Sequence, residues 1–490
     1  MNALLLYPET PPTFWSFKHI LSFVSRRSAF PPLGLMTVAA LLPADWNLRL
    51  IDLNVAALTD EDLAWADLVM ISAMIIQKES AVTTIRRCHR HNKIILAGGP
   101  LFSARPEDYP DVDHIVIGEA ENVLSEFLSD WAAGRAKRIY RSADWPDITL
   151  SPAPRWDLVK PKDYVTMSVQ FTRGCPFNCE FCDIIILNGQ RTRTKKPQQF
   201  LDELSGLYRS GWRGSVFVAD DNLIGNKVEI KRMLRALIDW QEARDYPFRF
   251  LTQASVNLAA DDELLRLMSA ANFFKVFLGL ESPNDNSLEE CGKFQNLKND
   301  TAAAVKKIHA HGMQVMSGFI VGFDSDPADI FEQQKRFIED MGVIIAMVGL
   351  LTALPGTRLY NRLKDQNRLL SESTGGNTDA VINFIPKMDK DLLLRKYKEL
   401  LRDLYSVRSY YGRINVFLRD YRPTVRGSKI EWTDVKAFLK SLLVIGVFSR
   451  AAGRYWSLLI RTVLFRRKVL PLAVELAIQG YHFQKVAANL

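Results

Sequence analysis

Short apolar stretches alternate with amphipathic stretches along residues 1–133. The apolar stretches carry hydrophobic side chains on both faces, as strands of a buried parallel sheet do, and the segments between them have helical spacing. This alternation predicts an α/β domain in which helices cover both faces of a doubly wound, Rossmann-like parallel sheet. The predicted strands are Ala3–Tyr7, Leu48–Asp52, Leu68–Ser72, Ile94–Ala97 and His114–Ile117.

The same alternation returns in residues 162–369. Prolines interrupt the stretch before it, so we interpret residues 134–161 as a linker. The later segment predicts six strand–helix units, fewer than the usual barrel of about eight strands, and we expect an open, partial (β/α)6 barrel with its site at the carboxyl ends of the strands. Its predicted strands are Val165–Gln170, Ser215–Ala219, Arg249–Gln253, Val276–Leu280, Gln314–Ile320 and Met347–Leu354, and predicted helices include Asp261–Ala271, Asp300–His311 and Pro327–Met341.

Residues 370–490 have helical spacing without strands, and we expect a helical C-terminal region. Asp389–Tyr411 predicts one long amphipathic helix, and residues 436–480 mix apolar stretches with Arg and Lys. Residues 401–490 hold 16 Lys and Arg against 5 Asp and Glu, so the positive charge of the chain, +8 overall, is concentrated there.

Aromatic, aliphatic and basic residues occur together in this basic tail. Trp456 and Phe465 precede the run Arg466-Arg467-Lys468, a mixture that is typical of a helix lying in a membrane interface. A packed helical cap with a solvated basic face is the alternative, and the pattern does not decide between the two.

Composition describes a large globular protein. Of the 490 residues, 48% are hydrophobic and 24% are charged. The first residues lack the basic lead and cleavage site of a signal peptide, and no charge-free apolar run reaches the roughly 18 residues of a membrane-spanning helix. The low cysteine content fits a reducing compartment. We therefore expect a cytoplasmic protein, peripheral to the inner face of the membrane if the tail is interfacial.

Three of the five cysteines lie within eight residues, at Cys175, Cys179 and Cys182. Three thiolates at this spacing can bind three irons of a cubane cluster and leave the fourth iron without a protein ligand. A zinc site would need a fourth ligand, and no His or further Cys lies within thirty residues. A disulfide framework is typical of small secreted chains. The spacing therefore predicts an iron–sulfur cluster that takes part in chemistry.

Polar motifs follow the predicted barrel strands: Phe217–Asn222, Gly279–Pro283, Ser317–Phe323 and Leu354–Tyr360. Together with the cysteines, they resemble the radical S-adenosylmethionine superfamily. The resemblance implies a [4Fe-4S] cluster on Cys175, Cys179 and Cys182, and S-adenosylmethionine near Phe181, Asp221, Gln253 and Glu281. Carboxylates suit the ammonium and hydroxyl groups of this cofactor, and an aromatic ring suits its base. Helix capping is the alternative role for Asp220, Asp221 and Glu281.

The N-terminal segment resembles the cobalamin-binding domain that precedes the radical core in a large subgroup. Tyr7-Pro8, Pro31–Leu35 and Gly98-Gly99-Pro100 carry this likeness. The Asp-x-His-x-x-Gly motif of many cobalamin proteins is absent, so the lower axial position of cobalt would be empty or taken by a side chain such as Gln77. The cobalamin contacts that we expect are Ser72, Gln77, Gly98, Gly99, Gly118 and Glu119.

Nearly the whole chain resembles the group that includes the hopanoid C-2 methylases. This implies a cobalamin-dependent radical enzyme, a C-methyltransferase for an unactivated carbon of a hydrophobic or lipid-like substrate, supplied with electrons by a reductant such as flavodoxin or ferredoxin. Radical cyclisation or rearrangement without methyl transfer is one alternative, and a non-catalytic cobalamin-binding protein with a structural cluster is another. Nucleic-acid modification is disfavoured, because the basic surplus lies among apolar residues and no RNA-binding module is present.

Replacing Cys175, Cys179 and Cys182 together by Ala should reduce iron after anaerobic reconstitution from about four atoms per chain to background. Cys88 and Cys291, which fall in predicted helices, should be dispensable, and their Ala variants serve as controls. Full iron retention in the triple variant would contradict the cluster assignment.

Overall fold

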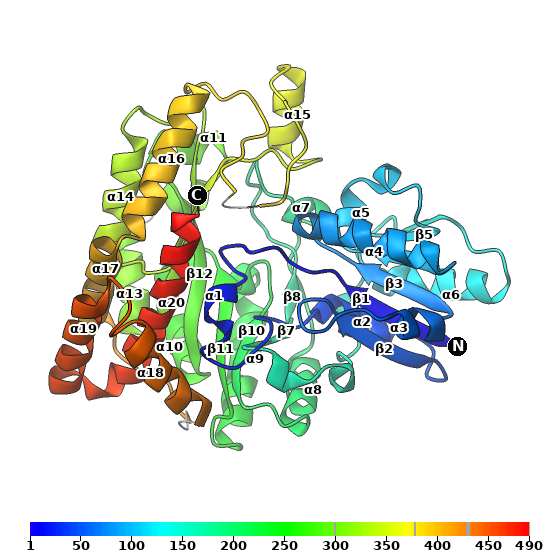
Figure 1. Ribbon diagram of the computed structural model, residues 1–490, viewed down its shortest axis with the longest axis horizontal. Coiled ribbons are helices and arrows are strands. Elements are labelled where there is room, and N and C mark those ends of the chain that lie inside the picture. Colours follow the sequence, from blue (N-terminus) through cyan, green and yellow to red (C-terminus); the bar gives the residue numbers. More distant parts are fainter. Residues whose placement is uncertain (298–299, 377–378, 428–431, 490) are drawn as a thin grey trace.

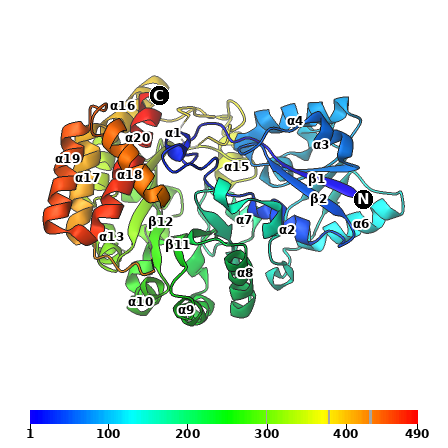
Figure 2. The same cartoon turned by 60° about the horizontal axis from the view of Figure 1, so that its bottom comes forward.

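Two six-stranded parallel sheets organise the chain (Figure 1), as seen in a computed structural model that describes residues 1–297, 300–376, 379–427 and 432–489. The first sheet has the order β2-β1-β3-β4-β5-β6 and the second the order β14-β13-β12-β11-β10-β7. A helical region covers the side of the second sheet that faces away from the first (Figure 2).

The N-terminal sheet is doubly wound, as predicted. Alternate side chains of β1 enter separate cores: Ala3 and Leu5 pack with α2 and α6, whereas Leu4 and Leu6 pack with α3, α4 and α5. The strands are β1 (Asn2–Tyr7), β2 (Asn47–Asp52), β3 (Leu68–Ser72), β4 (Ile94–Gly98), β5 (His114–Ile117) and β6 (Ile139–Arg141). The helices are α1 (Lys18–Leu21), α2 (Leu33–Ala40), α3 (Asp60–Trp65), α4 (Lys78–Arg90), α5 (Pro100–Ala104) and α6 (Leu124–Ala132).

The stretch interpreted as a linker, residues 134–161, is not free of regular structure. It contributes β6, which pairs in parallel with β5 at the edge of the sheet. The interpretation was wrong on this point because a three-residue edge strand is too short to show an apolar alternation. The domain boundaries at residues 133, 161 and 369 stay predictions.

The second sheet is the predicted open barrel of six parallel strands. Its strands are β7 (Met167–Val169), β10 (Gly214–Val218), β11 (Phe248–Ala254), β12 (Phe273–Glu281), β13 (Gln314–Val321) and β14 (Ala346–Leu350), and a small ladder joins β8 (Thr172–Arg173) to β9 (Arg193–Thr194). The helices in this part are α7 (Ile184–Leu187), α8 (Pro197–Arg209), α9 (Lys227–Glu242), α10 (Asp262–Ala270), α11 (Asp285–Glu290), α12 (Phe294–Leu297), α13 (Thr301–Ala310), α14 (Ile330–Asp340) and α15 (Arg358–Asp365).

Tyr397 of α16 and Tyr405, which follows this helix, cover the free edge of β14. The Tyr405 hydroxyl accepts from the Ala346 N–H at 3.1 Å and donates to the Ala346 carbonyl at 2.7 Å, and the Tyr397 hydroxyl donates to the Val348 carbonyl at 3.0 Å. Unpaired backbone groups of an edge strand are thereby satisfied. Six strands can therefore end at β14 without leaving this edge open.

Segments near both ends of the chain pack against the barrel. Glu475 of α20 forms an ion pair with Lys275 of β12. Phe14 stacks on Phe483 with ring centroids 4.4 Å apart, and its carbonyl lies 3.1 Å from Nε2 of His482. Phe14, in the segment between β1 and α1, thus packs against α20.

The C-terminal region is helical, but its first helix is divided. Asp389–Tyr411 was predicted as one helix; the chain instead breaks at Ser406, whose side chain accepts the Ser409 N–H and begins a second helix. The helices are α16 (Lys390–Leu404), α17 (Val407–Asp420), α18 (Trp432–Val444), α19 (Ala452–Phe465) and α20 (Leu470–Ala488). Among the described residues, no helix combines the length and the apolar character needed to cross a membrane.

Tyr405→Phe should lower the free energy of unfolding by about 1–3 kcal/mol, because it leaves the N–H and C=O of Ala346 buried without a partner. Chemical denaturation measures this. The control is Tyr208→Phe, since the Tyr208 hydroxyl has no hydrogen bond within the described residues and its ring is retained. Equal stability of the two variants would contradict the edge-capping role.

Candidate functional site

The three clustered cysteines lie on a loop between β8 and α7, at the carboxyl end of the barrel. Cys179 is buried, and Cys175 and Cys182 are half-buried free thiols. Burial raises the pKa of the Cys182 thiol to about 12 and also raises that of Cys175. Metal binding would therefore displace protons from these thiols. Within the described part of the chain, no three His, Cys, Asp or Glu side chains are grouped as ligands of a single metal ion.

Two consecutive aspartates hold the start of this cysteine loop. The Asp220 carboxylate accepts the N–H groups of Phe171 and Thr172 at 2.8 and 2.9 Å, and burial raises the pKa of Asp220 to about 7. Asp221 accepts the Gly174 N–H at 2.8 Å and the Asn188 amide at 2.9 Å. Asp221 therefore holds the start of the cysteine loop through hydrogen bonds. Its contact with S-adenosylmethionine stays a prediction.

Gly174 meets a requirement that no other residue can meet. Its φ is +90°, and a Cβ atom would lie 2.5 Å from the Arg191 carbonyl oxygen. The next residue, Cys175, donates its N–H to the Gly189 carbonyl at 3.2 Å. The loop therefore closes tightly on residues 188–191, which positions the first cysteine.

The far side of the cysteine loop is bound to α15. Arg362 donates to both carboxylate oxygens of Glu180 at 2.7 and 2.9 Å, and this contact raises the pKa of Arg362. Arg358 donates to the Asn178 carbonyl at 2.6 Å, and the Leu359 N–H donates to the Glu180 carbonyl at 3.0 Å. The motif that begins at Leu354 thus supports the loop, a role that the sequence did not indicate.

Glu281 ends β12 beside the cysteine loop with a left-handed backbone, φ +62°. Its carboxylate accepts from Nζ of Lys293 at 2.7 Å, and both side chains are largely buried. Burial would lower the pKa of Lys293, but the carboxylate of Glu281 beside it raises the pKa above its usual value. Lys293 therefore places a positive charge between a carboxylate and the cysteine loop. No sequence pattern marked it.

Cys291, an isolated cysteine in a predicted helix, contacts the cysteine loop through its backbone. It follows α11, its side chain is buried, and its carbonyl accepts the Glu180 N–H at 2.8 Å. Cys88, by contrast, is a buried residue of α4, in the core between this helix and the N-terminal sheet. That both are dispensable for iron stays a prediction.

One face of the barrel sheet combines apolar side chains with Gln253. Gln253 is partly exposed, shares a face of β11 with Leu251, and is the register partner of Phe277 on β12. Trp15, from the segment between β1 and α2, packs edge-on against Phe277 at 5.6 Å and donates its indole N–H to the Met347 sulfur at 2.9 Å. We call Trp15, Leu251, Gln253, Phe277 and Met347 the barrel face. Phe181, predicted to contact S-adenosylmethionine, is half-buried with its ring centre 6.5 Å from that of Phe323, and that contact stays a prediction.

Small residues gather at the carboxyl edge of the N-terminal sheet, as predicted. Ser72 ends β3 and is the register partner of Gly98, which ends β4. Position 99 requires glycine, because its φ is +89° and a Cβ atom would lie 2.8 Å from the Ser72 hydroxyl oxygen. A Cβ at Gly118 would meet nothing within 4 Å, and one at Gly98 only ordinary contacts at 3.5 Å or more. These positions leave room for a ligand to approach the backbone, which fits a cobalamin tail.

Gln77 and Glu119 lie near this edge but are engaged by protein groups. The Gln77 amide donates to the Thr10 hydroxyl at 3.2 Å and to the Pro8 carbonyl, and accepts the Met74 N–H at 2.9 Å. Glu119 forms ion pairs with Arg173 and Arg193, which flank the cysteine loop. The first residue anchors the segment after β1, and the second joins the two sheets. Contact of either with cobalamin stays a prediction.

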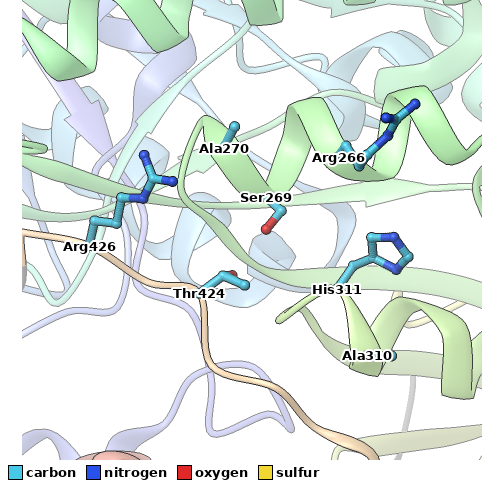
Figure 3. Close-up of a pocket in the computed structure, with 7 residues that line it drawn as sticks. All are labelled: Arg266, Ser269, Ala270, Ala310, His311, Thr424 and Arg426. Atoms are coloured by element: carbon cyan, nitrogen blue, oxygen red, sulfur yellow. The ribbon is translucent and has the colours of Figure 1, made fainter.

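A separate pocket of about 280 Å³ lies far from these groups, where α10 and α13 end (Figure 3). Arg266, His311 and Arg426 line it together with Ser269 and Thr424. Arg266 donates to the carbonyl of Asp262, the first residue of α10, at 3.2 Å, and Nδ1 of His311 lies 2.8 Å from the Lys307 carbonyl. Both side chains are therefore held by the backbone of their own helices.

Known proteins resemble this chain over most of its length. The radical SAM superfamily model matches residues 169–338, the B12 binding domain model residues 22–128, and a model described as a domain of unknown function residues 357–490. An uncharacterized methyltransferase of Synechocystis is 43% identical, covering 93% of this chain and 86% of that protein. The hopanoid C-2 methylase of Rhodopseudomonas palustris is 34% identical, covering 81% and 77%.

A solved structure resembles the whole fold. It is that of OxsB, a cobalamin-dependent S-adenosylmethionine radical enzyme, with aqua-cobalamin and S-adenosylmethionine bound. The TM-score is 0.67 at 15% identity, and the match covers 100% of this chain and 80% of that chain. At this identity the likeness concerns the fold.

Gly174→Ala should reduce iron retention several-fold, because the left-handed backbone costs Ala on the order of 1 kcal/mol or more and the added Cβ overlaps the Arg191 carbonyl. Iron content after anaerobic reconstitution measures this. Gly34→Ala is the control, since a Cβ at this position in α2 meets nothing within 4 Å. Wild-type iron content in Gly174→Ala would contradict the positioning role of the loop.

Proposed function

Because the chain belongs to the cobalamin-dependent radical S-adenosylmethionine enzymes, in the group that includes hopanoid C-2 methylase, we propose that it methylates an unactivated carbon of a lipid-like substrate at the inner face of a membrane. Two relatives that match over most of their length, at 43% and 34% identity, are named as methyltransferases. The observation that carries the substrate class is the apolar barrel face, on the sheet whose carboxyl end bears the cysteine loop.

When bound, the cluster with S-adenosylmethionine supplies the substrate radical, and cobalamin supplies the methyl group. We assign the cluster to Cys175, Cys179 and Cys182, which share one loop. For S-adenosylmethionine we keep Phe181, Asp221, Gln253 and Glu281, and for cobalamin Ser72, Gln77, Gly98, Gly99, Gly118 and Glu119. Electrons would come from a reductant such as flavodoxin or ferredoxin.

The residues around the cysteine loop suit these groups. Glu281 and Lys293 present a carboxylate and an ammonium next to the loop, which matches the paired charges of an amino acid cofactor. Asp220, Asp221 and Arg362 hold the loop from two sides, so the thiols keep their positions without help from a ligand. This rigidity limits the entropy that the protein would lose on binding the cluster.

The barrel face supports a hydrophobic substrate. The indole of Trp15 and the ring of Phe277 pack edge to face, and the thioether of Met347 contacts the indole N–H. Apolar walls of this kind bind an apolar ligand and keep water from a reactive site. Gln253 adds one amide to the same face.

Radical cyclisation without methyl transfer is the second candidate. It is favoured less, because relatives named as anaerobic magnesium-protoporphyrin IX monomethyl ester cyclases match this chain at 22% to 23% identity, below the 34% of the methylase. A nucleic-acid substrate is not proposed.

Anaerobically reconstituted, reduced protein should transfer a deuterated methyl group from labelled S-adenosylmethionine to a lipid in a bacterial extract, with 5′-deoxyadenosine formed at the same time. Mass spectrometry of the lipid and the nucleoside fractions measures both products. Cys179→Ala is the inactive control. If 5′-deoxyadenosine forms and no product carries the label, the cyclisation candidate replaces methyl transfer; if neither forms, both are wrong.

A further inference from the structure

Large apolar side chains are exposed on α18, on α19 and on the turn between them. Phe448 is 82% exposed and Phe465 is 79% exposed. Nearly half of the large apolar side chains that are exposed in the described residues lie between residues 432 and 465. We call this set the docking face: Trp432, Leu439, Leu443, Val447, Phe448, Trp456, Ile460, Val463, Leu464 and Phe465.

α19 is apolar on both of its sides. Leu458, Leu459 and Thr462 are buried, and α19 packs on α20. Trp456, Ile460 and Val463, at the spacing of one helix face, point outward and are 40% to 55% exposed. A surface helix of a globular protein is expected to present polar side chains there. An apolar outer face of this extent indicates an interaction site.

The charge around the docking face has one sign. No Asp or Glu occurs between residues 435 and 474, whereas Arg450, Arg454 and Lys468 are exposed and have no ion pair within the described residues. Arg466 differs, since it is half-buried and donates to the Tyr421 carbonyl at 2.7 Å. The free positive charges therefore surround the apolar side chains, and Arg466 belongs to the fold.

We propose that the docking face binds the surface of an anionic lipid bilayer, an inference that rests on the proposed function for its biological purpose. Apolar side chains would enter the boundary between headgroups and acyl chains, and the basic residues would contact anionic headgroups. A second copy of this chain fits less well, because a two-fold contact through this face would bring the same positive charges together.

α18, which carries part of the docking face, and α20 also contact the segment that supplies Trp15 to the barrel face. Nζ of Lys440 on α18 donates to the Ser22 carbonyl at 3.1 Å and lies 5.0 Å from the centre of the Phe23 ring. α20 packs against α1 and α19 (Figure 2). The bilayer-binding helices and the apolar barrel face thus share one packed unit, which suits a substrate delivered from lipid.

Co-sedimentation with vesicles tests the proposal. The protein should pellet with phosphatidylcholine vesicles that contain roughly one-third phosphatidylserine and release at about 0.5 M NaCl, where charges are screened. Phe448→Ser with Phe465→Ser, and separately Arg450→Glu with Arg454→Glu and Lys468→Glu, should each lower the partition coefficient about tenfold or more. The control for the apolar pair is Leu150→Ser with Val228→Ser, and the control for the basic triple is Arg86→Glu with Arg90→Glu and Lys160→Glu. All of these positions are exposed and lie outside the docking face.

Two results would overturn the proposal: a protein that stays in the supernatant at low salt, and binding that the docking-face variants leave unchanged. A dimer in sedimentation velocity that these variants dissociate, without vesicle binding, would assign the face to a second copy instead. Methyl transfer to a detergent-dispersed lipid distinguishes a failure of docking from a failure of the proposed function. Docking is supported if the docking-face variants methylate detergent-dispersed lipid but not lipid in vesicles. If the wild type methylates neither, the proposed function is contradicted and the docking face is not.

Discussion

Glu119, at the carboxyl edge of the N-terminal sheet, forms ion pairs with two arginines that flank the cysteine loop, and Glu121 adds a third pair to Arg173 at 2.8 Å. The side chains of Glu119, Arg173 and Arg193 are 7%, 13% and 15% exposed. Removing one partner from such a buried pair leaves a charge that costs several kcal/mol. The two sheets are therefore fixed relative to each other at the edge where each predicted cofactor site lies. Chemistry that passes a group from one cofactor to another requires this fixed geometry.

The cysteine loop is likewise fixed by contacts with two separate parts of the barrel. Its residues make hydrogen bonds with the end of β10 through Asp220 and Asp221, and with α15 through Glu180 and Arg362. The loop is thus bound to the residues that follow the second and the sixth strands of the barrel, β10 and β14. A ring of contacts around a short loop orients three thiols without placing them in a regular element.

The strands could be predicted because their apolar runs are local signals. β6 could not, since three residues at a sheet edge carry no period, and the break at Ser406 depends on one capping side chain within an apolar pattern that continues across it. The cysteines were found from spacing alone. Lys293, Arg173 and Arg362 were not, because each acquires its role from a partner brought close by the fold, as with the 182 positions between Arg362 and Glu180.

Tyr405 and Trp15 have a consequence for how the molecule can be divided. The middle segment, residues 162–369, has the sequence of a complete domain, yet its last strand is finished by a hydroxyl 59 positions beyond Ala346. The indole of Trp15, which lies 332 positions before its partner Met347, lines part of the interior of this segment. Excised alone, this segment would keep a bare strand edge, a template for association with other chains. The barrel is therefore not expected to fold as an independent unit, and its assembly depends on long-range contacts that slow folding.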